Sequence, residues 1–433
     1  MHVSTVTLAQ SATHQSEALL FSILLQLVVI VLMGRIGGEI AERVSQSRAV
    51  GEIIMGILLG PSLLGLLAPD VFHYVFMPNT SQTMFILSQI GLVLLMFQIG
   101  LEFDFSHLTA KKSRNAVMNI STASIGIPFA LGFLFGYYTA PILSPEANSM
   151  ASGLFVATAF SITALPILGR IMMDFNMTRT KIAVIGISVA AITDVAGWLL
   201  LAVVTAVSLS DFSAWGFVRT LGLLALYIAI SWMVVRPALQ WSVRRSAAGG
   251  EPLSNNLMGV LVAAIFLSAM TTYMIGIFAI FGGFMLGVLL HDQHAVVKAW
   301  RKKVGEFVAV FFLPIFFTYT GLRTDIGWLD SWELWGWCGL LIVLAVTGKL
   351  GGCYLAARWS GLNHHESKVI GIMMNTRALM ELIIINVGFD LGVISQNVFT
   401  MLVLMAVFST VITVPGLRRW LPGAGVLVTM PKK

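Results

Sequence analysis

Charged residues are scarce in this chain. Only 11% of its 433 residues are Asp, Glu, Lys or Arg, whereas 57% are hydrophobic. This composition leaves too few polar side chains to cover the surface of soluble domains of that total size. A water-soluble globular protein is therefore excluded, and the chain is expected to lie in a lipid bilayer.

Cysteine is scarce as well, with only Cys338 and Cys353 in the chain. Both lie in one apolar segment, where a helix would separate them by about 22 Å, too far for a disulfide. Four histidines near predicted cytoplasmic helix ends form no metal or catalytic set; they are His291, His294, His364 and His365. We expect neither an enzyme nor a bound cofactor.

The net charge of +6 does not indicate nucleic acid. The basic residues occur in short clusters between apolar runs and do not line one continuous surface. The expected partner is the lipid bilayer.

Apolar runs of roughly 18 to 25 residues recur along the chain, each long enough to cross about 30 Å of hydrocarbon as a helix. Helices are expected because a lipid-embedded backbone must satisfy its own hydrogen bonds. The fold class is thus an all-α polytopic membrane protein with about thirteen transmembrane helices. The predicted spans are 17–34, 48–67, 82–101, 115–136, 150–170, 180–207, 215–235, 255–273, 275–291, 304–322, 334–357, 367–388 and 397–416.

These spans form one transmembrane domain, residues 17–416. Residues 1–16 are expected to be an extracytoplasmic tail, because they lack the basic region of a cleaved signal peptide. Residues 417–433 are expected to be a cytoplasmic tail, too short for a soluble domain, so any regulatory module would be a separate subunit.

Basic residues alternate between the loops, which sets the orientation. They gather in every second loop, and the other loops hold only Arg219 and Arg323. The pattern predicts an extracytoplasmic N-terminus and a cytoplasmic C-terminus. The basic loops contain Arg35, Arg43 and Arg48; Lys111, Lys112 and Arg114; Arg170, Arg179 and Lys181; Arg236, Arg244 and Arg245; Lys298, Arg301, Lys302 and Lys303; Arg358 and Lys368; and Arg418, Arg419, Lys432 and Lys433.

Two short motifs recur at a similar offset. Gly-Leu-x-x-Asp stands at 100–104 and 321–325, and Gly-x-x-x-Gly at 56–60 and 283–287. The offset of about 220 to 230 residues predicts two inverted six-helix repeats. The repeats are residues 17–207 and 255–416, with 215–235 as a linker helix. Close helix packing by chance glycines is the alternative explanation.

Four ionisable residues lie deep in apolar runs: Asp194, Lys349, Arg377 and Glu381. A charge at the bilayer midplane costs about 2.5 to 3.5 kcal/mol on insertion scales, so each needs a partner or water. Arg377 and Glu381 stand four apart on one helix and can pair as a structural clamp or line an ion path. Asp194 and Lys349 have no local partner and are expected to pair with each other.

A lone carboxylate in a hydrated cavity binds either a proton or a monovalent cation, which is the competition that antiport requires. Burial and a nearby ammonium act in opposite directions on its titration. Asp194 is therefore the candidate ion site, and Ser161, Thr163 and Thr193 are candidate oxygen ligands. A purely structural ion pair is the alternative.

Pro166 interrupts the span 150–170 next to Ser161 and Thr163. A proline inside a helix frees a backbone carbonyl, and nearby hydroxyls can take over its bonding. In the predicted repeat the counterpart is the span 367–388, at Asn375 to Arg377. Interrupted helices at matching repeat positions indicate a transporter site.

Several of these motifs together resemble the monovalent cation/proton antiporter-2 family, which includes bacterial sodium/proton antiporters, Kef-type potassium efflux systems and plant cation/proton exchangers. The resemblance covers nearly the whole chain. It rests on the segments Val-Gly-Glu-Ile-Ile-Met-Gly-Ile-Leu-Leu-Gly-Pro-Ser at 50–62, Gly-Leu-Glu at 100–102, Ser-Ile-Thr-Ala-Leu-Pro at 161–166, Ile-Thr-Asp at 192–194 and Asn-Thr-Arg-Ala-Leu-Met-Glu at 375–381.

The resemblance implies the sodium/proton antiporter fold with two crossed broken helices, in a homodimer whose core slides like an elevator. It also implies that Asp194 is the ion-binding aspartate, Lys349 its counter-charge, and Arg377 with Glu381 the charged pair of the second broken helix. Family members commonly carry Asp, Asn or Gln before the aspartate, whereas this chain has Thr193. A threonine carries no second proton, so electroneutral exchange of one proton per cation is expected as long as Lys349 stays charged. If Lys349 titrates instead, a second proton moves and net charge crosses the membrane, and the sequence leaves this choice open.

The expected function is secondary antiport of cytoplasmic sodium or potassium for external protons across a bacterial inner membrane. A potassium efflux channel of the Kef type and a membrane sensor without transport are the alternatives. The sequence leaves the choice of cation open.

Overall fold

The computed structural model describes residues 2–44, 46, 48–77, 80–101, 114–175, 177, 180–209, 214–247, 254–377 and 379–425. Several residues used above lie outside these ranges, namely residues 102–104 of the repeated motif, the basic residues Lys111, Lys112, Arg179, Lys432 and Lys433, and residues 426–433 of the expected C-terminal tail. Within the described ranges the backbone forms helices and connecting loops and no strand.

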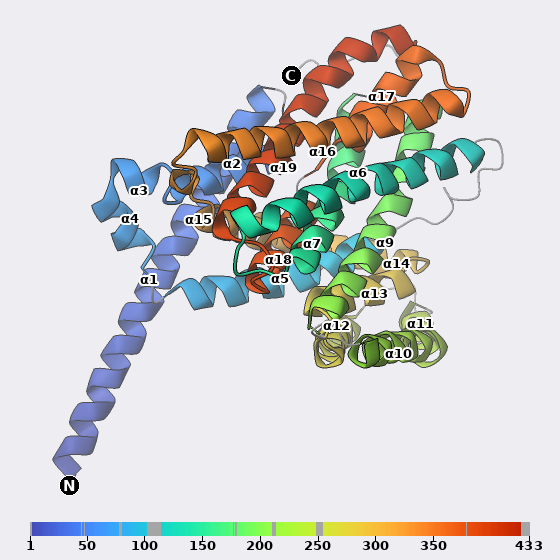
Figure 1. Cartoon of the computed structure of the whole chain (residues 1–433). Helices are drawn as coiled ribbons and strands as arrows, with labels where there is room; N and C mark the ends of the chain where they lie inside the picture. Colours follow the sequence, from blue (N-terminus) through green and yellow to red (C-terminus); the bar gives the residue numbers. More distant parts are fainter. Residues whose placement is uncertain are drawn as a thin grey trace.

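Nineteen α-helices follow one another in the described ranges (Figure 1). They are α1 (His2–Arg43), α2 (Arg48–Leu59), α3 (Leu64–Leu67), α4 (Pro69–Val75), α5 (Ser81–Leu101), α6 (Arg114–Leu143), α7 (Ser149–Ser161), α8 (Leu165–Asp174), α9 (Lys181–Leu209), α10 (Ala214–Ile230), α11 (Arg236–Ala247), α12 (Asn255–Ile275), α13 (Ala279–Leu289), α14 (His294–Trp300), α15 (Leu313–Arg323), α16 (Trp332–Trp359), α17 (His364–Met374), α18 (Leu379–Asp390) and α19 (Gln396–Trp420).

The all-helical membrane fold predicted from the sequence is confirmed. Of the helices in the described ranges, nine are long and apolar enough to cross a membrane, or up to ten if the bent pair His294–Gly305 and Val308–Trp328 counts as one span. All thirteen predicted spans fall on helices, but 150–170, 275–291 and 367–388 fall on shorter ones. The count of thirteen stays a prediction.

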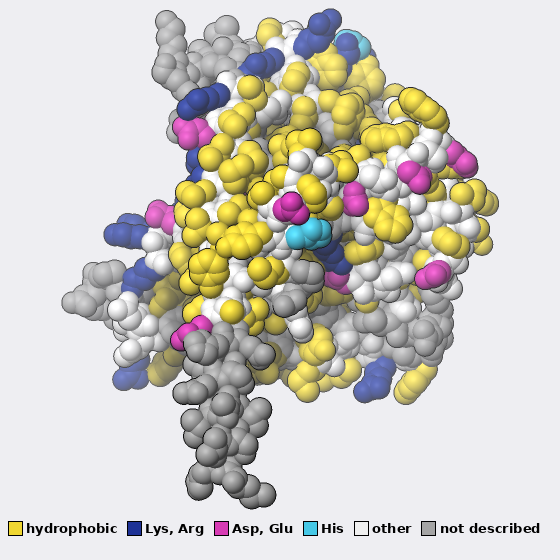
Figure 2. All heavy atoms as spheres, turned by 90° about the vertical axis from the view of Figure 1, so that its left-hand side faces the viewer, with side chains coloured by type: hydrophobic (Ala, Val, Ile, Leu, Met, Phe, Trp, Pro, Cys, Tyr) yellow, Lys and Arg dark blue, Asp and Glu magenta, His cyan; other side chains and the backbone are white. Residues whose placement is uncertain are grey.

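The outer surface has the character that lipid requires. Figure 2 shows a face covered mainly by hydrophobic side chains, with few charged ones among them. Large apolar side chains are exposed on many helices, such as Leu32 on α1 (58%) and Met274 on α12 (83%). Exposed apolar surface of this extent is favourable only when lipid covers it.

The helices pack as two groups. We call α6 to α9 and α16 to α19 the site group, and α1, α2, α5, α12, α13 and α15 the flanking group. The most extensive helix packing lies inside each group, as between α6 and α16 or between α5 and α13. In Figure 1, α6 and α16 run side by side across the site group, and α10 to α13 lie together at the lower right of the view.

Glycines allow two helix pairs of the flanking group to approach closely. Directly after α2, a Cβ at Gly60 would lie 2.6 Å from the carbonyl oxygen of Gly321 on α15. On α13, a Cβ at Gly287 would contact Gly100 and the carbonyl oxygen of Phe97 on α5. The pair α2–α15 thus matches the pair α13–α5. This arrangement is the one that the predicted inverted repeat requires, although the repeat itself remains a prediction.

Arg323 connects the two groups at the end of α15. Its guanidinium donates to Asp390 on α18 (2.5 Å) and to Asn386 (3.0 Å), and it lies over the ring of Phe389, 4.6 Å from the centroid. The lone basic residue of a predicted outer loop is therefore neutralised by the site group.

Gly321→Ala is expected to destabilise the protein by about 1–3 kcal/mol, because the new Cβ would overlap the backbone of α2 at Gly56. The measurement is the melting temperature of the detergent-solubilised protein. Gly339→Ala on α16 is the matched control, since a Cβ there meets nothing within 4 Å. Equal melting temperatures for the two variants would contradict the close packing of α2 on α15.

Candidate functional site

The first predicted helix break is present between α7 and α8. α7 begins after Asn148, whose side chain accepts from the amide N–H groups of Met150 (2.9 Å) and Ala151 (3.3 Å), a typical N-cap. It ends at Ser161, and Ile162 is extended (φ −84°, ψ 150°). Pro166 is the second residue of α8. Because proline lacks an amide hydrogen and collides with the carbonyl four residues earlier, α7 cannot continue through it.

The second break, between α17 and α18, contains no proline and is held by α19 instead. α17 ends at Met374. The Thr410 hydroxyl on α19 accepts from the Arg377 amide (3.2 Å) and donates to the Arg377 carbonyl (2.8 Å). Asn375 donates from Nδ2 to the carbonyl of Ser409 (3.2 Å). The two Thr410 bonds satisfy backbone groups of Arg377 that a continuous helix would have paired internally, and the Asn375 bond ties the break to α19.

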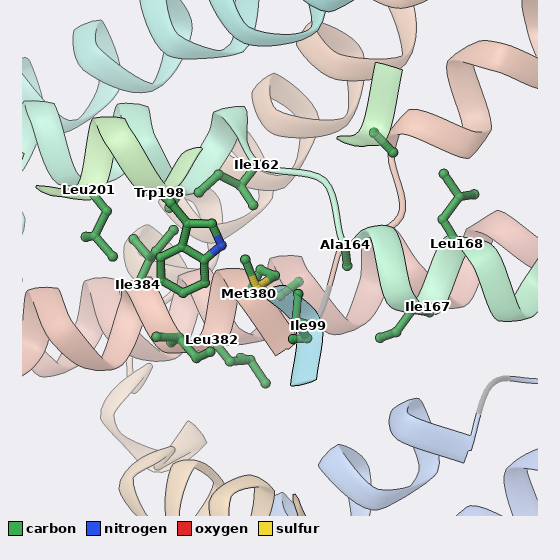
Figure 3. Close-up of a cluster of buried hydrophobic side chains, with 14 of the residues drawn as sticks. Ile99, Ile162, Ala164, Ile167, Leu168, Trp198, Leu201, Met380, Leu382 and Ile384 are labelled. Atoms are coloured by element: carbon green, nitrogen blue, oxygen red, sulfur yellow. The ribbon is translucent and has the colours of Figure 1, made fainter. Parts of the chain in front are cut away.

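The two breaks meet. The amide of Ala164 donates to the carbonyl of Thr376 (3.0 Å), and the hydroxyl of Thr163 donates to the carbonyl of Met374 (3.2 Å). Figure 3 shows the non-helical link from Ile162 to Ala164 and the buried apolar side chains around it. The site group therefore contains two broken helices joined at their interruptions.

Two buried cations cap the broken end of α7. The last carbonyls of a helix have no partner inside it and form the negative end of its dipole. Arg377 donates to the carbonyls of Ala159 (2.9 Å) and Phe160 (3.0 Å). Lys349 donates to the carbonyl of Ser161 and to that of Ser124 on α6 (2.8 Å). Three consecutive terminal carbonyls are thus satisfied by two side chains, one from α16 and one from the break between α17 and α18.

Arg377 and Glu381 form the predicted pair. Their side chains are 0% and 1% exposed, and Nη1 lies 2.8 Å from Oε1. The remaining carboxylate oxygen of Glu381 has no hydrogen-bond partner. The Arg377–Glu381 pair, called the clamp below, therefore carries no net charge, and Arg377 also caps the end of α7.

Asp194 lies on α9 beside the first break. Gly197, three residues on and on the same face of α9, packs on the link: a Cβ there would lie 2.5 Å from Cγ1 of Ile162. Asp194 is 0% exposed, and neither of its carboxylate oxygens has a hydrogen-bond partner. A carboxylate without a partner at such depth is costly, so its retention points to a ligand.

The expected direct pairing of Asp194 with Lys349 is wrong. Among the described residues, no ion pair joins them, and Asp194 receives no hydrogen bond. The reason is that the Lys349 ammonium is taken by the carbonyls at the end of α7. Sequence spacing could not show that those carbonyls compete for it. The role of Lys349 as counter-charge stays a prediction.

The three candidate hydroxyl ligands are buried. Thr193 donates to the carbonyl of Ala190 (3.0 Å), Ser161 to that of Ala157 (2.7 Å), and Thr163 to Met374 as described. Each hydroxyl uses its hydrogen on a carbonyl and keeps oxygen lone pairs available. None of them contacts the carboxylate of Asp194.

Sequence reasoning did not assign four further polar groups near the breaks. The unpartnered buried oxygens are Oγ of Ser124, Oδ1 of Asn375, Oγ1 of Thr376 and Oγ of Ser409. The available signal was the presence of uncharged polar residues in otherwise apolar helices beside the interruptions. Oxygen atoms of this kind suit water or a hard monovalent cation.

No group of three or more His, Cys, Asp or Glu side chains able to hold a metal ion occurs in the part of the chain that the structure describes. The chemistry available at the breaks is therefore that of carboxylates, hydroxyls and carbonyls, and Asp194 is the carboxylate that has no ion-pair partner among the described residues. Such a set can exchange a proton for a cation.

Comparison with known proteins places this chain in a family. Residues 27–422 match the model of the family described as sodium/hydrogen exchanger, transmembrane. The chain is 39% identical over 398 residues to the Na(+)/H(+) antiporter NhaS4 of Synechocystis, covering 92% of this chain and 96% of the relative.

A plant relative and a solved structure agree with this match. Cation/H(+) antiporter 17 of Arabidopsis thaliana is 32% identical over 397 residues, and the match spans 91% of this chain but only 47% of that protein. The sodium proton antiporter MjNhaP1 from Methanocaldococcus jannaschii at pH 8 superposes with a TM-score of 0.66 at 14% identity, over 96% of this chain and 100% of that one. That superposition establishes the likeness of the fold.

Arg377→Leu is expected to lower stability by about 3–5 kcal/mol, because Glu381 is left as an unpaired buried charge. Arg377→Leu combined with Glu381→Leu should lose less, since no lone charge remains. The melting temperature of the purified protein is the measurement. Arg43→Leu removes an exposed pair of the same spacing with Glu39 and should cost at most about 1 kcal/mol. A single variant as stable as Arg43→Leu would contradict the clamp.

Proposed function

This chain belongs to the sodium/hydrogen exchanger family, and from that membership we propose that it exchanges sodium or potassium for protons at one site, the carboxylate of Asp194. As a cation/proton antiporter it is a multi-pass membrane transporter and not an enzyme. The observation that carries the proposal is the complete burial of Asp194 with both oxygens unpartnered, beside the meeting point of two broken helices.

A single carboxylate couples the two fluxes by competition. Protonated Asp194 is neutral, and so is ionised Asp194 with one bound monovalent cation. The bare carboxylate, by contrast, carries a charge that costs several kcal/mol in a low-dielectric interior. The site with an empty, ionised Asp194 is therefore the form least able to pass from one side of the membrane to the other. Exchange follows because the site must carry either the proton or the cation each time it changes sides.

The same reasoning makes the exchange electroneutral. Both loaded forms carry the same net charge as long as Lys349 keeps its proton, which its two carbonyl contacts favour. Thr193, next to Asp194, has no ionisable group for a second proton. Moving one net charge across the membrane changes the free energy by about 2.3 kcal/mol per 100 mV. The membrane voltage therefore affects the exchange only if net charge moves.

The proposed ligands of the cation are Asp194 together with hydroxyl or carbonyl oxygens from Thr193, Ser161 and Thr163. Lys349 is proposed as counter-charge through the broken end of α7, and Arg377 with Glu381 as the clamp that keeps that end in place. Unassigned oxygens of Asn375 and Thr376 lie at the second break. The selectivity between sodium and potassium would depend on how these oxygens close around the ion.

We propose that the site group moves against the flanking group like an elevator. The division of the packing into two groups supports this, since few helices bridge them apart from α19 with α2 and the linker α10 with α9. The flanking group would form the homodimer. The alternation of basic loops supports an extracytoplasmic N-terminus in a bacterial inner membrane.

Asp194→Asn is expected to abolish exchange. The assay is proton flux in proteoliposomes that contain a pH dye, started by adding sodium or potassium outside an acidified lumen. In the parent chain a cation should drive proton exit, and the effective cation identifies the substrate. Asp330→Asn is the control, because Asp330 is an exposed carboxylate in a loop before α16, and it should retain the flux.

Other outcomes of that assay would remove the proposal. Equal flux in the parent and in Asp194→Asn would show that Asp194 is not the site. Cation flux without proton counter-movement would indicate a channel, and no response to any alkali cation would favour a sensor.

Electroneutrality predicts that the initial exchange rate is the same at 0 mV and at −100 mV, set with valinomycin and potassium gradients, with sodium as the driving ion. A rate that changes by about tenfold or more would mean that charge moves, since 2.3 kcal/mol exceeds the 1.4 kcal/mol of a tenfold change. Lys349 would then be the group to test for a second proton.

A further inference from the structure

One face of α9 carries Asp194, Trp198 and Thr205. The spacings of four and seven residues place these three side chains along one stripe of a helix. Trp198 is 2% exposed and Thr205 is 0% exposed. The stripe begins at the proposed ion site and runs toward the C-terminal end of α9, which the basic-loop pattern assigns to the extracytoplasmic side.

Trp198 joins the two helix groups. Its ring stacks on that of Phe284 on α13, with centroids 5.6 Å apart and planes at 29°. Trp198 belongs to the site group and Phe284 to the flanking group. Figure 3 shows Trp198 in the apolar cluster that also contains Ile162 and Ile384. The indole thus fills the boundary between the groups one helical turn from Asp194.

A small cavity lies along this stripe, beyond Trp198. It measures about 10 Å³, close to the room that one water molecule needs. Half of its wall is on α9, and the other half is the start of α13 with the loop before it. The lining residues are Trp198, Leu201, Ala202 and Thr205 on α9, and Ile277, Phe278, Ile280 and Phe281.

Two polar groups on the stripe are buried without a partner, Nε1 of Trp198 and Oγ1 of Thr205. Other buried helical threonines, such as Thr139 and Thr158, donate to the carbonyl four residues earlier (2.7 Å each). An unmade hydrogen bond at such a site costs about 1–3 kcal/mol. This cost is understandable if both groups are hydrated in another conformation of the protein.

We infer that the extracytoplasmic route to Asp194 runs along this face of α9, and that Trp198 closes it by stacking on Phe284. The inference rests on the proposed function, because it assigns the route by which protons and cations reach that same site. When the site group moves against the flanking group, the stack separates. Water entering from the extracytoplasmic side then reaches the Thr205 hydroxyl, the Trp198 N–H and Asp194 in turn.

The test is the reactivity of Thr205→Cys toward the membrane-impermeant cation MTSET, applied from the extracytoplasmic side of intact cells and read by mass spectrometry. The native Cys338 and Cys353 are buried (1% and 0% exposed). The parent chain should therefore not react with MTSET and serves as the background control. Thr205 lines the small cavity whose wall Trp198 completes against the start of α13. Thr205→Cys should therefore react slowly, and at least tenfold faster when Trp198→Ala removes both that wall and the stack that holds the boundary closed.

Two matched controls separate the route from general loosening of the protein. Trp300→Ala also removes a buried tryptophan (1% exposed) with an unpartnered indole N–H, 4.6 Å from the Phe97 ring, but far along the chain from α9. It should leave the Thr205→Cys rate within about twofold. Leu199→Cys, on the exposed apolar side of α9 (46%), should stay unreactive because lipid covers it.

The inference is overturned if Trp198→Ala gives no acceleration, if Trp300→Ala accelerates equally, or if Thr205→Cys reacts only with reagent on the cytoplasmic side. The same rates are measured in an Asp194→Asn background, where no exchange is expected. Acceleration there by Trp198→Ala supports the route even if Asp194 proves not to be the exchange site, so failure of one proposal is distinguishable from failure of the other.

Discussion

Unsatisfied carbonyls at the broken end of α7 are the constraint on which the rest of the site depends. In a membrane no bulk water reaches them, so another part of the chain must donate hydrogen bonds. Lys349 does so from α16 and Arg377 from the break between α17 and α18, and their charges suit the negative end of the α7 dipole. The two cations and the break therefore stabilise each other. Neither buried charge would be tolerable without the break, and the break would be costly without them.

This arrangement leaves Asp194 without a fixed partner. Had Lys349 bound Asp194 directly, a tight buried ion pair would compete with any incoming ion. Because the ammonium is held by carbonyls, both oxygens of the Asp194 carboxylate stay without a hydrogen-bond partner. In the proposed exchange, the cost of this unpartnered carboxylate favours the binding of either a proton or a cation.

Close packing within the flanking group contrasts with its boundary to the site group. Glycines let α2 approach α15 and α13 approach α5 to backbone contact, which is how helices associate when lipid supplies no hydrophobic force between them. The boundary between the two groups instead holds an aromatic stack at Trp198, a small cavity and the Arg323 cluster. In the proposed elevator movement, these are the contacts that would separate.

The sequence by itself determined the membrane environment, the helical class, the first break at Pro166 and the identity of four of the buried charged residues, because hydropathy, proline chemistry and the cost of charge in lipid act locally. Only the tertiary structure decided which partners those charges take. Arg377 and Glu381 pair as predicted because only four residues separate them, although Arg377 lies in the break before α18, whereas Lys349 binds the Ser124 and Ser161 carbonyls in place of Asp194. The second break has no proline and depends on Thr410 of α19. Such choices are made between segments far apart in the chain, where several acceptors compete for one donor and spacing carries no information about which of them is nearest.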